Sequence, residues 1–308
     1  MQKRSWIAGL IFLFLCITWG SSFILMKKGL ESFSPLQIAG LRLIAAALTL
    51  LPFLFKVKYK LSKVEKRAIL VVGIVGNGIP AFLFPLAETH ISSASAGVLN
   101  ALSPLFALLL GQLVFQLQFS KAQNVGVFIG FIGAVFLVLA GGGELDMFTQ
   151  LSYSGLVILA TVGYGLSTII IKRYLNETPP VLATGLAFCL MAVPYGLYLI
   201  LGGGLPVTYA AAPDFWESLL YVVILGSIGT ALAVYLYYRL IQMTDPIVAS
   251  SVTYLIPVVA LAWGLLDGEQ FSSGQWVGMG IILLGVYLSN RKKAKVTTPV
   301  QAESHPAG

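Results

Sequence analysis

The sequence predicts an all-α integral membrane protein with ten transmembrane helices, arranged as two inverted five-helix repeats. The first observation is composition: 10% of the 308 residues are charged and 57% are hydrophobic, whereas soluble domains carry about 25% charged residues. The second is that long apolar runs recur along the whole chain. The third is that the second half repeats short patterns of the first. A chain this poor in charge cannot cover a water-exposed surface, so we expect lipid around it.

Ten apolar segments have the length of a membrane helix, which needs about 20 mostly apolar residues. They lie near residues 6–26, 35–55, 68–87, 93–115, 123–141, 152–171, 180–201, 217–238, 246–266 and 273–290. The first segment follows Lys3 and Arg4, as the apolar part of a signal peptide does. A similar segment recurs inside the chain at residues 164–175, where no signal peptide can stand, and this recurrence favours a membrane helix instead. Short connections join the segments, and the polar tail 291–308 is expected to be cytoplasmic and disordered.

The distribution of lysine and arginine predicts the orientation. With a cytoplasmic N-terminus and ten spans, sixteen of the nineteen basic residues fall on the cytoplasmic side. Lys27 and Lys28 fall outside, and Arg42 lies within the second span. Cytoplasmic loops of membrane proteins carry the excess of lysine and arginine. We therefore expect a plasma or inner membrane protein with both termini in the cytoplasm, and the net charge of +7 reports these loops rather than nucleic acid.

A repeated segment divides the chain into halves. Residues 19–30 read WGSSFILMKKGL, and residues 164–175 read YGLSTIIIKRYL. Further pairs align at a similar offset, among them Pro104 with Pro257 and Gly111 with Gly264. Each half holds five spans, and because five is odd the second half enters the membrane from the opposite side.

The expected units are residues 1–146, residues 147–290 and the tail 291–308. Inverted repeats are common in secondary transporters, where the substrate site lies near the membrane midplane between the halves. A duplication that only enlarged the helical bundle is the alternative.

Three short segments resemble the EamA-type family of the drug/metabolite transporter superfamily. They are WGSSF at the end of the first span, LRLIAAAL around Arg42, and the stretch from Pro257 to Gly268-Glu269-Gln270. The resemblance covers about residues 5–290 and implies a small-molecule carrier, often an exporter of amino acids or other metabolites. The first half has Gln116 where the second has Glu269, so no symmetric pair of carboxylates is implied.

Ten residues are predicted to line a substrate path. Polar groups inside lipid are costly and tend to face the bundle interior or a water-filled cavity, and small-molecule sites combine aromatic walls with a few hydrogen-bonding groups. The candidates recur in pairs between the halves: Trp19 with Tyr164, Ser22 with Ser167, Asn77 with Thr230, Phe84 with Tyr237, and Asn100 with Thr253. Packing and bonding between helices is the alternative role for each of them.

Several other residues inside the apolar segments have more ordinary expectations. Glycines are expected to allow close helix packing: Gly20, Gly126, Gly130, Gly133 and Gly165. Arg42 is expected to have a structural role or to extend to the membrane surface, with contact to a substrate carboxylate as the alternative. Glu88 and His90 lie near the outer end of the third span, where we expect solvation, and the sequence alone does not make them a proton relay.

The predicted function is that of a secondary transporter, an exporter of small metabolites such as amino acids that works by alternating access. A channel or facilitator is the first alternative, but no filter loop is visible. An intramembrane enzyme is the second, yet the chain has two histidines, no HExxH motif and no Walker motif. We expect no catalytic residue, metal ligand or cofactor. The expected partners are a small-molecule substrate and the lipid bilayer, and no nucleic acid, while proton coupling and the choice between monomer and homodimer stay open.

Overall fold

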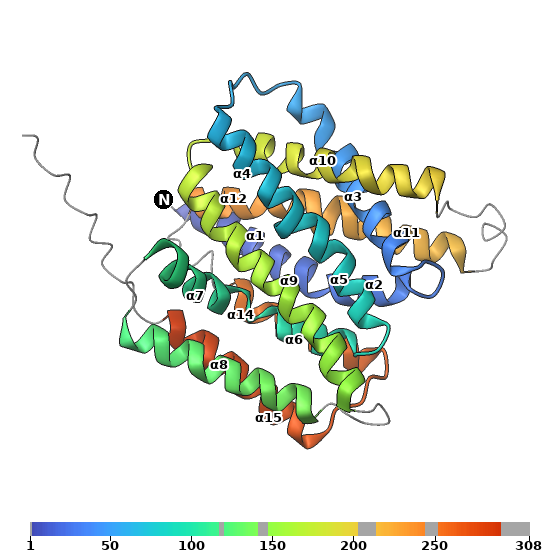
Figure 1. The fold of residues 1–308 in the computed structure, drawn as a ribbon, viewed down its shortest axis with the longest axis vertical. Coiled ribbons are helices and arrows are strands. Elements are labelled where there is room, and N and C mark those ends of the chain that lie inside the picture. The colour runs from blue at the N-terminus through green and yellow to red at the C-terminus, as the bar shows by residue number, and fades with distance from the viewer. Residues whose placement is uncertain (1, 117–119, 141–146, 203–213, 244–251, 291–308) are drawn as a thin grey trace, which may run out of the picture.

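The computed structural model describes residues 2–116, 120–140, 147–202, 214–243 and 252–290, and these are helices joined by short connections (Figure 1). The helices of the first half are α1 (Gln2–Gly20), α2 (Ser22–Gly29), α3 (Pro35–Leu54), α4 (Lys63–Gly73), η1 (Ile74–Gly78), α5 (Ile79–Glu88), α6 (Ser93–Asn100), α7 (Ser103–Phe115) and α8 (Lys121–Ala140). Those of the second half are α9 (Met147–Tyr174), α10 (Pro180–Leu201), α11 (Phe215–Gly226), η3 (Ser227–Leu232), α12 (Ala233–Met243), α14 (Val252–Leu266) and α15 (Ser273–Asn290).

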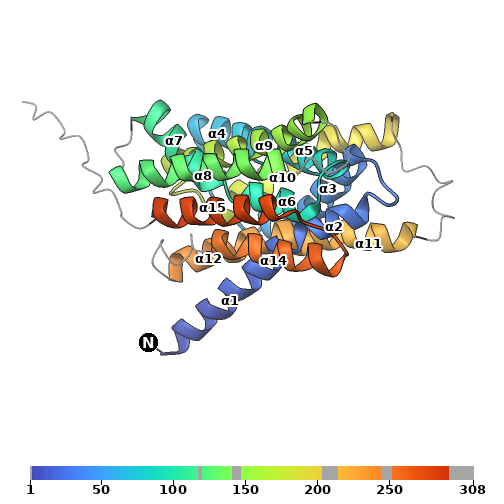
Figure 2. The same ribbon diagram turned by 90° about the horizontal axis from the view of Figure 1, so that it is seen from below.

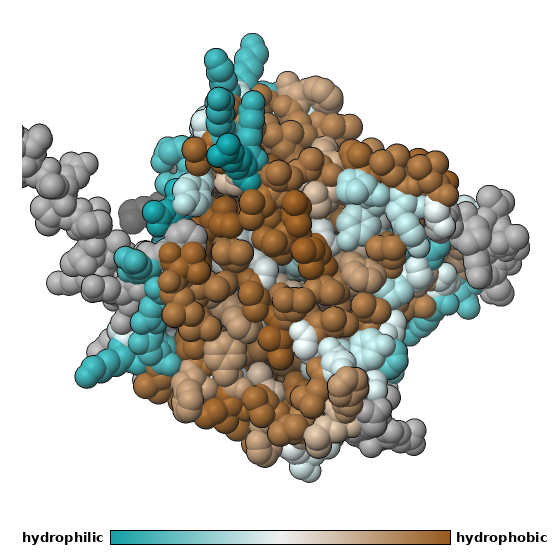
Figure 3. Space-filling view, viewed as in Figure 1, coloured by the Kyte–Doolittle hydropathy of each residue, from teal (hydrophilic) through white to brown (hydrophobic). Residues whose placement is uncertain are grey.

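Eight helical stretches of the described residues are long and apolar enough to cross a membrane, and two shorter apolar helices, Leu255–Leu266 and Ser273–Ser289, follow them. Length and composition thus identify eight of the predicted spans, and ten spans stay a prediction. The start of the predicted ninth span, residues 246–251, and the predicted tail 291–308 lie outside the described residues. Side chains at the surface agree with lipid as the surrounding solvent: a broad apolar area covers the middle of the molecule and polar side chains gather at its two ends (Figure 3). The chain is a multi-pass membrane protein.

Several stretches that the sequence predicts as single helices are interrupted in the structure. The first breaks between α1 and α2 at Ser21, whose Oγ donates to the Ile17 carbonyl and accepts a hydrogen bond from Trp263 Nε1. The fourth breaks between α6 and α7, where Pro104 stands in the first turn of the new helix. Proline has no N–H to continue a preceding helix. The third and eighth stretches continue through the π-helical turns η1 and η3.

Two pairs of helices, each with one member from either half, lie along one another. These pairs are α3 with α10 and α8 with α15, and the second lies along the lower edge of the molecule in Figure 1. Glycines allow the close approach of α8 and α15. A Cβ atom on Gly126 would clash with the backbone nitrogen of Ser289, and one on Gly285 would clash with the backbone nitrogen of Gly130. The predicted packing role of the fifth-span glycines is confirmed.

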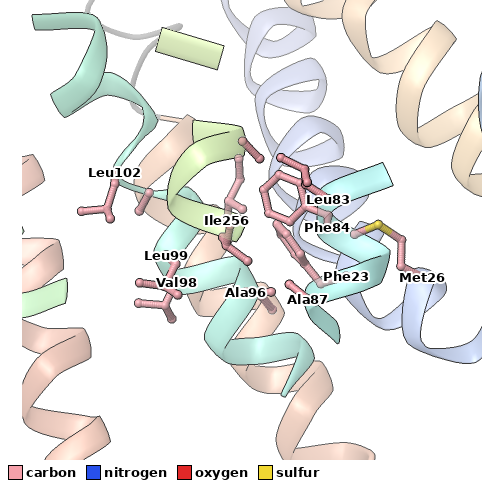
Figure 4. Close-up of a cluster of buried hydrophobic side chains, with 14 of the residues drawn as sticks. Phe23, Met26, Leu83, Phe84, Ala87, Ala96, Val98, Leu99, Leu102 and Ile256 are labelled. Atoms are coloured by element: carbon pink, nitrogen blue, oxygen red, sulfur yellow. The ribbon is translucent and has the colours of Figure 1, made fainter. Parts of the chain in front are cut away.

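The remaining helices build the centre of the bundle. Helix α1 of the first half packs on α14 of the second, and α9 of the second half packs on α7 and α5 of the first. The two halves therefore pack against each other at the centre of the bundle. The N-terminal part of α1 projects away from the bundle (Figure 2). One apolar cluster fills the space between these helices, and Figure 4 shows Phe23 and Phe84 beside Leu83 and Ala87 within it. Residues from both halves belong to this cluster.

Candidate functional site

Four of the predicted aromatic and repeat residues form two ring contacts between the halves. The rings of Trp19 on α1 and Tyr237 on α12 lie 5.2 Å apart between centroids, tilted by 56°. The rings of Phe84 on α5 and Tyr164 on α9 lie 5.8 Å apart, stacked at 21°. Trp19 corresponds to Tyr164 in the repeat, and Phe84 corresponds to Tyr237. The same contact is therefore made twice, each time by one residue from each half.

The π-helical turns η1 and η3 occupy equivalent places in the third and eighth stretches. Asn77 Nδ2 donates to the carbonyl of Val72, five residues earlier, at 3.0 Å. Thr230 Oγ1 donates to the carbonyl of Leu225, also five residues earlier, at 2.8 Å. Each predicted polar residue thus bonds a carbonyl at the wide turn of its own helix. π-helical turns inside α-helices are frequent at functional sites.

Ser22 and Ser167 each face the π-helical turn of the other half. A Cβ atom on Gly229 of η3 would lie 3.3 Å from Ser22 Oγ, and one on Gly76 of η1 would clash with Ser167 Oγ. Both serines are 6% exposed. Ser22 Oγ, at the start of α2, donates to the Thr18 carbonyl near the end of α1. The Ser167 hydroxyl has no hydrogen-bond partner among the described residues.

The glycines beside the aromatic residues of the repeat bring neighbouring helices close. A Cβ atom on Gly20 would lie 2.5 Å from Val259 Cβ on α14. One on Gly165 would lie 2.7 Å from the Ala107 nitrogen on α7. The predicted role of these two glycines is confirmed, and any larger residue there would force the halves apart.

Arg42 has a structural role and points into the bundle. Its Nε donates to Thr230 Oγ1 at 3.0 Å, and one terminal nitrogen lies 3.7 Å from the Met26 sulfur. The guanidinium therefore connects α3 to η3 in the other half. Extension of Arg42 to the membrane surface, which the sequence allowed, does not occur.

Asn100 and Thr253 are less informative. Both are partly buried, and the backbone and side-chain oxygens of Asn100 accept from Ser103 Oγ. The hydrogen bonds of Asn100 stay within its own turn of the chain. Their place on the wall of one central cavity stays a prediction.

An ion-pair cluster joins α2 to the segment after α14. Lys27 Nζ lies 2.7 Å from an Asp267 oxygen and 2.8 Å from a Glu269 oxygen. Lys28 Nζ lies 2.9 Å from Asp267 and 3.1 Å from Glu31. The hydrogen bond from Lys27 holds the pKa of the Asp267 carboxyl below its ordinary value, against an opposing effect of burial. We call these five residues the ion-pair cluster, and the end of the bundle where they lie the Lys27 end.

Glu269 also caps the N-terminus of α6. One carboxylate oxygen accepts from the Ser93 nitrogen at 2.9 Å and from Ser93 Oγ at 2.8 Å, and the other accepts from the Ala94 nitrogen at 3.1 Å. A negative charge is favourable at a helix N-terminus. Gly268 has φ of 81°, a left-handed conformation that suits glycine and ends α14 in a turn. The Glu269 carboxylate therefore connects the end of α14 to both α2 and α6.

The sequence encodes this cluster at one end of the bundle. The basic pair recurs in the second half as Lys172 and Arg173. The acidic positions do not recur, because Val114 and Gln116 occupy them in the first half. Sequence reasoning noted the difference at Gln116 but did not find the cluster. A search for acidic residues at the end of the ninth span, opposite the outer lysines, would have indicated it.

Glu88, the last residue of α5, is buried rather than solvated, so the expectation from sequence is wrong for it. It is 7% exposed, and neither carboxylate oxygen has a hydrogen-bond partner in the described part of the chain. The charged groups close enough to act on it are Glu269, Lys27 and Arg42. His90 is exposed, as expected, and stacks on Tyr153 with ring centroids 3.7 Å apart.

A membrane bundle with paired polar and aromatic side chains at its centre has the features of a transporter, and comparison with known proteins agrees. The chain belongs to the EamA-like transporter family, whose model matches residues 6–139 and again residues 151–291. The two matches cover nearly all of the helical part of the chain.

Individual relatives carry transporter names. The chain is 30% identical over 283 residues to the uncharacterized inner membrane transporter YedA of Escherichia coli K12, covering 89% of this chain and 87% of that one. It is 24% identical to a probable amino-acid metabolite efflux pump of Salmonella typhimurium, covering 91% and 94%. A chain of known crystal structure has the same fold, with a TM-score of 0.61 at 18% identity, covering 93% of this chain and 97% of that one.

Proposed function

We propose that this protein is a secondary transporter that exports small metabolites, amino acids among them, by alternating access. The moving parts are two inverted five-helix repeats, residues 1–146 and 147–290. The observation that carries the proposal is the doubled aromatic contact, Trp19 with Tyr237 and Tyr164 with Phe84. Two similar bundles that pack against each other through the same contacts can rock between two arrangements of similar energy. Inverted-repeat transporters expose a central site to either side in this way.

The proposed substrate path lies between these contacts. The aromatic rings stack on the apolar part of a substrate, and polar groups of the π-helical turns and facing helices bond its polar part: Ser22, Asn77, Asn100, Ser167, Thr230 and Thr253. The π-helical turns support this role, because the side chains of Asn77 and Thr230 each donate a hydrogen bond to the backbone carbonyl five residues earlier. A substrate that bonds these groups would change the geometry of both turns.

The conformation described here is closed at the Lys27 end. Glu269 connects α14 of the second half to α2 and α6 of the first half, so separation of the halves at this end breaks its bonds. We propose that both termini are cytoplasmic, which places the Lys27 end outside. The excess of basic residues at the other end supports this orientation. A membrane relative named as an inner membrane transporter supports the location in the cell's plasma or inner membrane.

Transport by reconstituted protein tests the proposal. Purified protein in proteoliposomes is given a panel of labelled amino acids and other metabolites, and uptake and efflux are measured with and without a pH gradient. Trp19→Ala and Tyr164→Ala are compared with Leu13→Ala, because Leu13 lies on α1 near Trp19 and is 53% exposed on the lipid side. Folded protein is quantified for each variant by size-exclusion chromatography in detergent.

We expect Trp19→Ala and Tyr164→Ala to lower the transport rate per folded molecule by about 2- to 10-fold, the range of one aromatic contact. Leu13→Ala should transport at the unmodified rate. If the two aromatic variants lose transport only in proportion to folded protein, the rings are packing residues and the proposed path is wrong. If no metabolite in the panel moves faster than in empty liposomes, the transport proposal itself fails.

A further inference from the structure

We propose that Glu88 is a proton-binding site whose occupancy controls the opening of the Lys27 end. The ligand is a single proton, held by the carboxyl group while this end is closed and released when it opens. The inference rests on the proposed function in one respect, since it takes the Lys27 end to open during transport.

The burial of Glu88 supports a bound proton in the closed conformation. The residue is 7% exposed, and both carboxylate oxygens lack a hydrogen-bond donor in the described residues. An ionised carboxylate that is buried without a partner is strongly unfavourable, and such a group neutralises instead. Its neighbour Ala87 is fully buried in the apolar cluster between the helices, so protein packing surrounds this end of α5.

The positive charges near Glu88 are already engaged. Arg42 on α3 donates to Thr230 and contacts Met26. Lys27 on α2 lies within 2.8 Å of oxygens of both Asp267 and Glu269. Neither cation bonds Glu88, although both act on it electrostatically.

The other elements packed on α5 offer Glu88 no compensating charge. Helix α6 and η1 contain no titratable residue. Helix α9 presents Tyr164, whose ring is stacked on Phe84, and Tyr153, whose ring is stacked on His90. Glu269, after α14, carries a negative charge that repels an ionised Glu88. Protonation removes this repulsion.

Ionisation of Glu88 would weaken the ion-pair cluster. A second carboxylate near Lys27 competes with Glu269 for the same ammonium group and repels Glu269 itself. Acid therefore favours the closed Lys27 end, and the preference is lost as the pH rises and Glu88 ionises. The equivalent position in the second half is Ile241, so the repeat does not place a second carboxyl group at the opposite end of the bundle.

Spin-label distances test the link between the proton and the opening, without a substrate. Nitroxide labels are placed at Ser32→Cys, after α2, and at Gln270→Cys, after α14, with Cys16 and Cys189 replaced by alanine. The distance distribution is measured in proteoliposomes between about pH 5 and about pH 9, on both sides of neutrality. The same titration is made with Glu88→Gln, which mimics the protonated form, and with Glu177→Gln, an exposed control.

The expected result is a change of at least about tenfold in the ratio of open to closed molecules across this range, equal to one unit of differential proton affinity. Glu177→Gln should follow the same curve, and Glu88→Gln should stay closed throughout this range. If Glu88→Gln titrates like the unmodified protein, or if the unmodified protein does not respond to pH, the proposal is overturned.

Infrared spectroscopy provides a second reading that does not require Glu88→Gln to fold. At neutral pH the unmodified protein should show the carbonyl band of a protonated carboxyl, and Glu88→Asp should shift that band. The absence of the band, or a band unchanged by Glu88→Asp, contradicts the proposal. Neither measurement needs transport, so a failure of the metabolite panel and a failure of this inference give different results.

Discussion

Replacement of Glu269 by glutamine is the perturbation that the structure describes most fully. The side chain is 5% exposed, and its carboxylate bonds Lys27, Ser93 and Ala94 at distances between 2.8 and 3.1 Å. Glutamine keeps the shape of the side chain but removes its charge and turns one acceptor into a donor. That donor would face either the Lys27 ammonium group or the Ala94 N–H.

The size of the effect follows from these contacts. Hydrogen bonds to a charged group contribute about 1.5–3 kcal/mol, against about 0.5–1.5 kcal/mol for neutral ones. The Lys27 side chain is 34% exposed, so its ion pair alone adds no more than about 1 kcal/mol. A net loss of about 2 kcal/mol is therefore expected for the closed Lys27 end. This corresponds to an increase of about 30-fold in the ratio of open to closed molecules.

Cysteine accessibility measures this ratio. Ser95 on α6 is 4% exposed, so Ser95→Cys should react with a membrane-impermeant maleimide only when the Lys27 end opens. The native Cys16 and Cys189 are replaced by alanine. Glu269→Gln should raise the labelling rate by about 30-fold. Glu177→Gln should leave it unchanged, because that carboxylate is exposed and accepts from the neighbouring Asn176. Equal labelling rates in the two variants would refute the assigned role of Glu269.

Three further predictions concern other contacts. Thr230→Val removes the acceptor for Arg42 and should destabilise the protein by about 1–3 kcal/mol, seen as a lower unfolding temperature in detergent; no change would mean that η3 does not depend on this hydroxyl. Gly285→Leu should lower the unfolding temperature more than Gly280→Leu on the same helix, because a Cβ at 285 meets backbone and one at 280 meets nothing within 4 Å; similar losses would contradict the α8–α15 interface. The Asp267 carboxyl has a pKa below 3.8 in the closed structure. Its ion pairs therefore stabilise the closed Lys27 end above about pH 4, and this stabilisation is lost as the pH falls through the lowered pKa. Spin-label distances that show a closed Lys27 end down to about pH 2 would contradict these ion pairs.

Much of the bundle could be predicted from the sequence because the signals are local. A stretch of about 20 apolar residues marks a membrane helix wherever it stands, and the repeated WGSSFILMKKGL segment marked Trp19 and Tyr164 as equivalent. The contacts of these two rings with Tyr237 and Phe84 follow the same equivalence. The packing role of the α8 glycines could also be predicted, because a small residue inside a membrane span commonly allows close helix packing.

The rest depends on contacts between distant segments, which leave little local signal. The turn at η3 requires Thr230 to bond Leu225 and Arg42 together, and Arg42 lies in the other half of the chain. Glu88 stands at the end of a span, where hydropathy predicts water, and its burial results from the segments that surround it. The ion pairs of Lys27 with Asp267 likewise join residues that the sequence holds far apart.

The most direct test of alternating access is a reversible disulfide across the halves at the Lys27 end. A Cβ atom on Gly264 of α14 would lie 2.9 Å from Ala94 Cβ on α6, nearer than the separation of about 3.8 Å in a disulfide. It would also lie 2.5 Å from a carboxylate oxygen of Glu269, which has to shift, so the reduced double variant is the reference for transport. Ala94→Cys with Gly264→Cys is reconstituted, and transport of a metabolite identified in the panel is measured before oxidation, after oxidation and after reduction. We predict that oxidation lowers transport to the level of empty liposomes and that reduction restores it. Full transport by the oxidised, cross-linked protein would contradict the account.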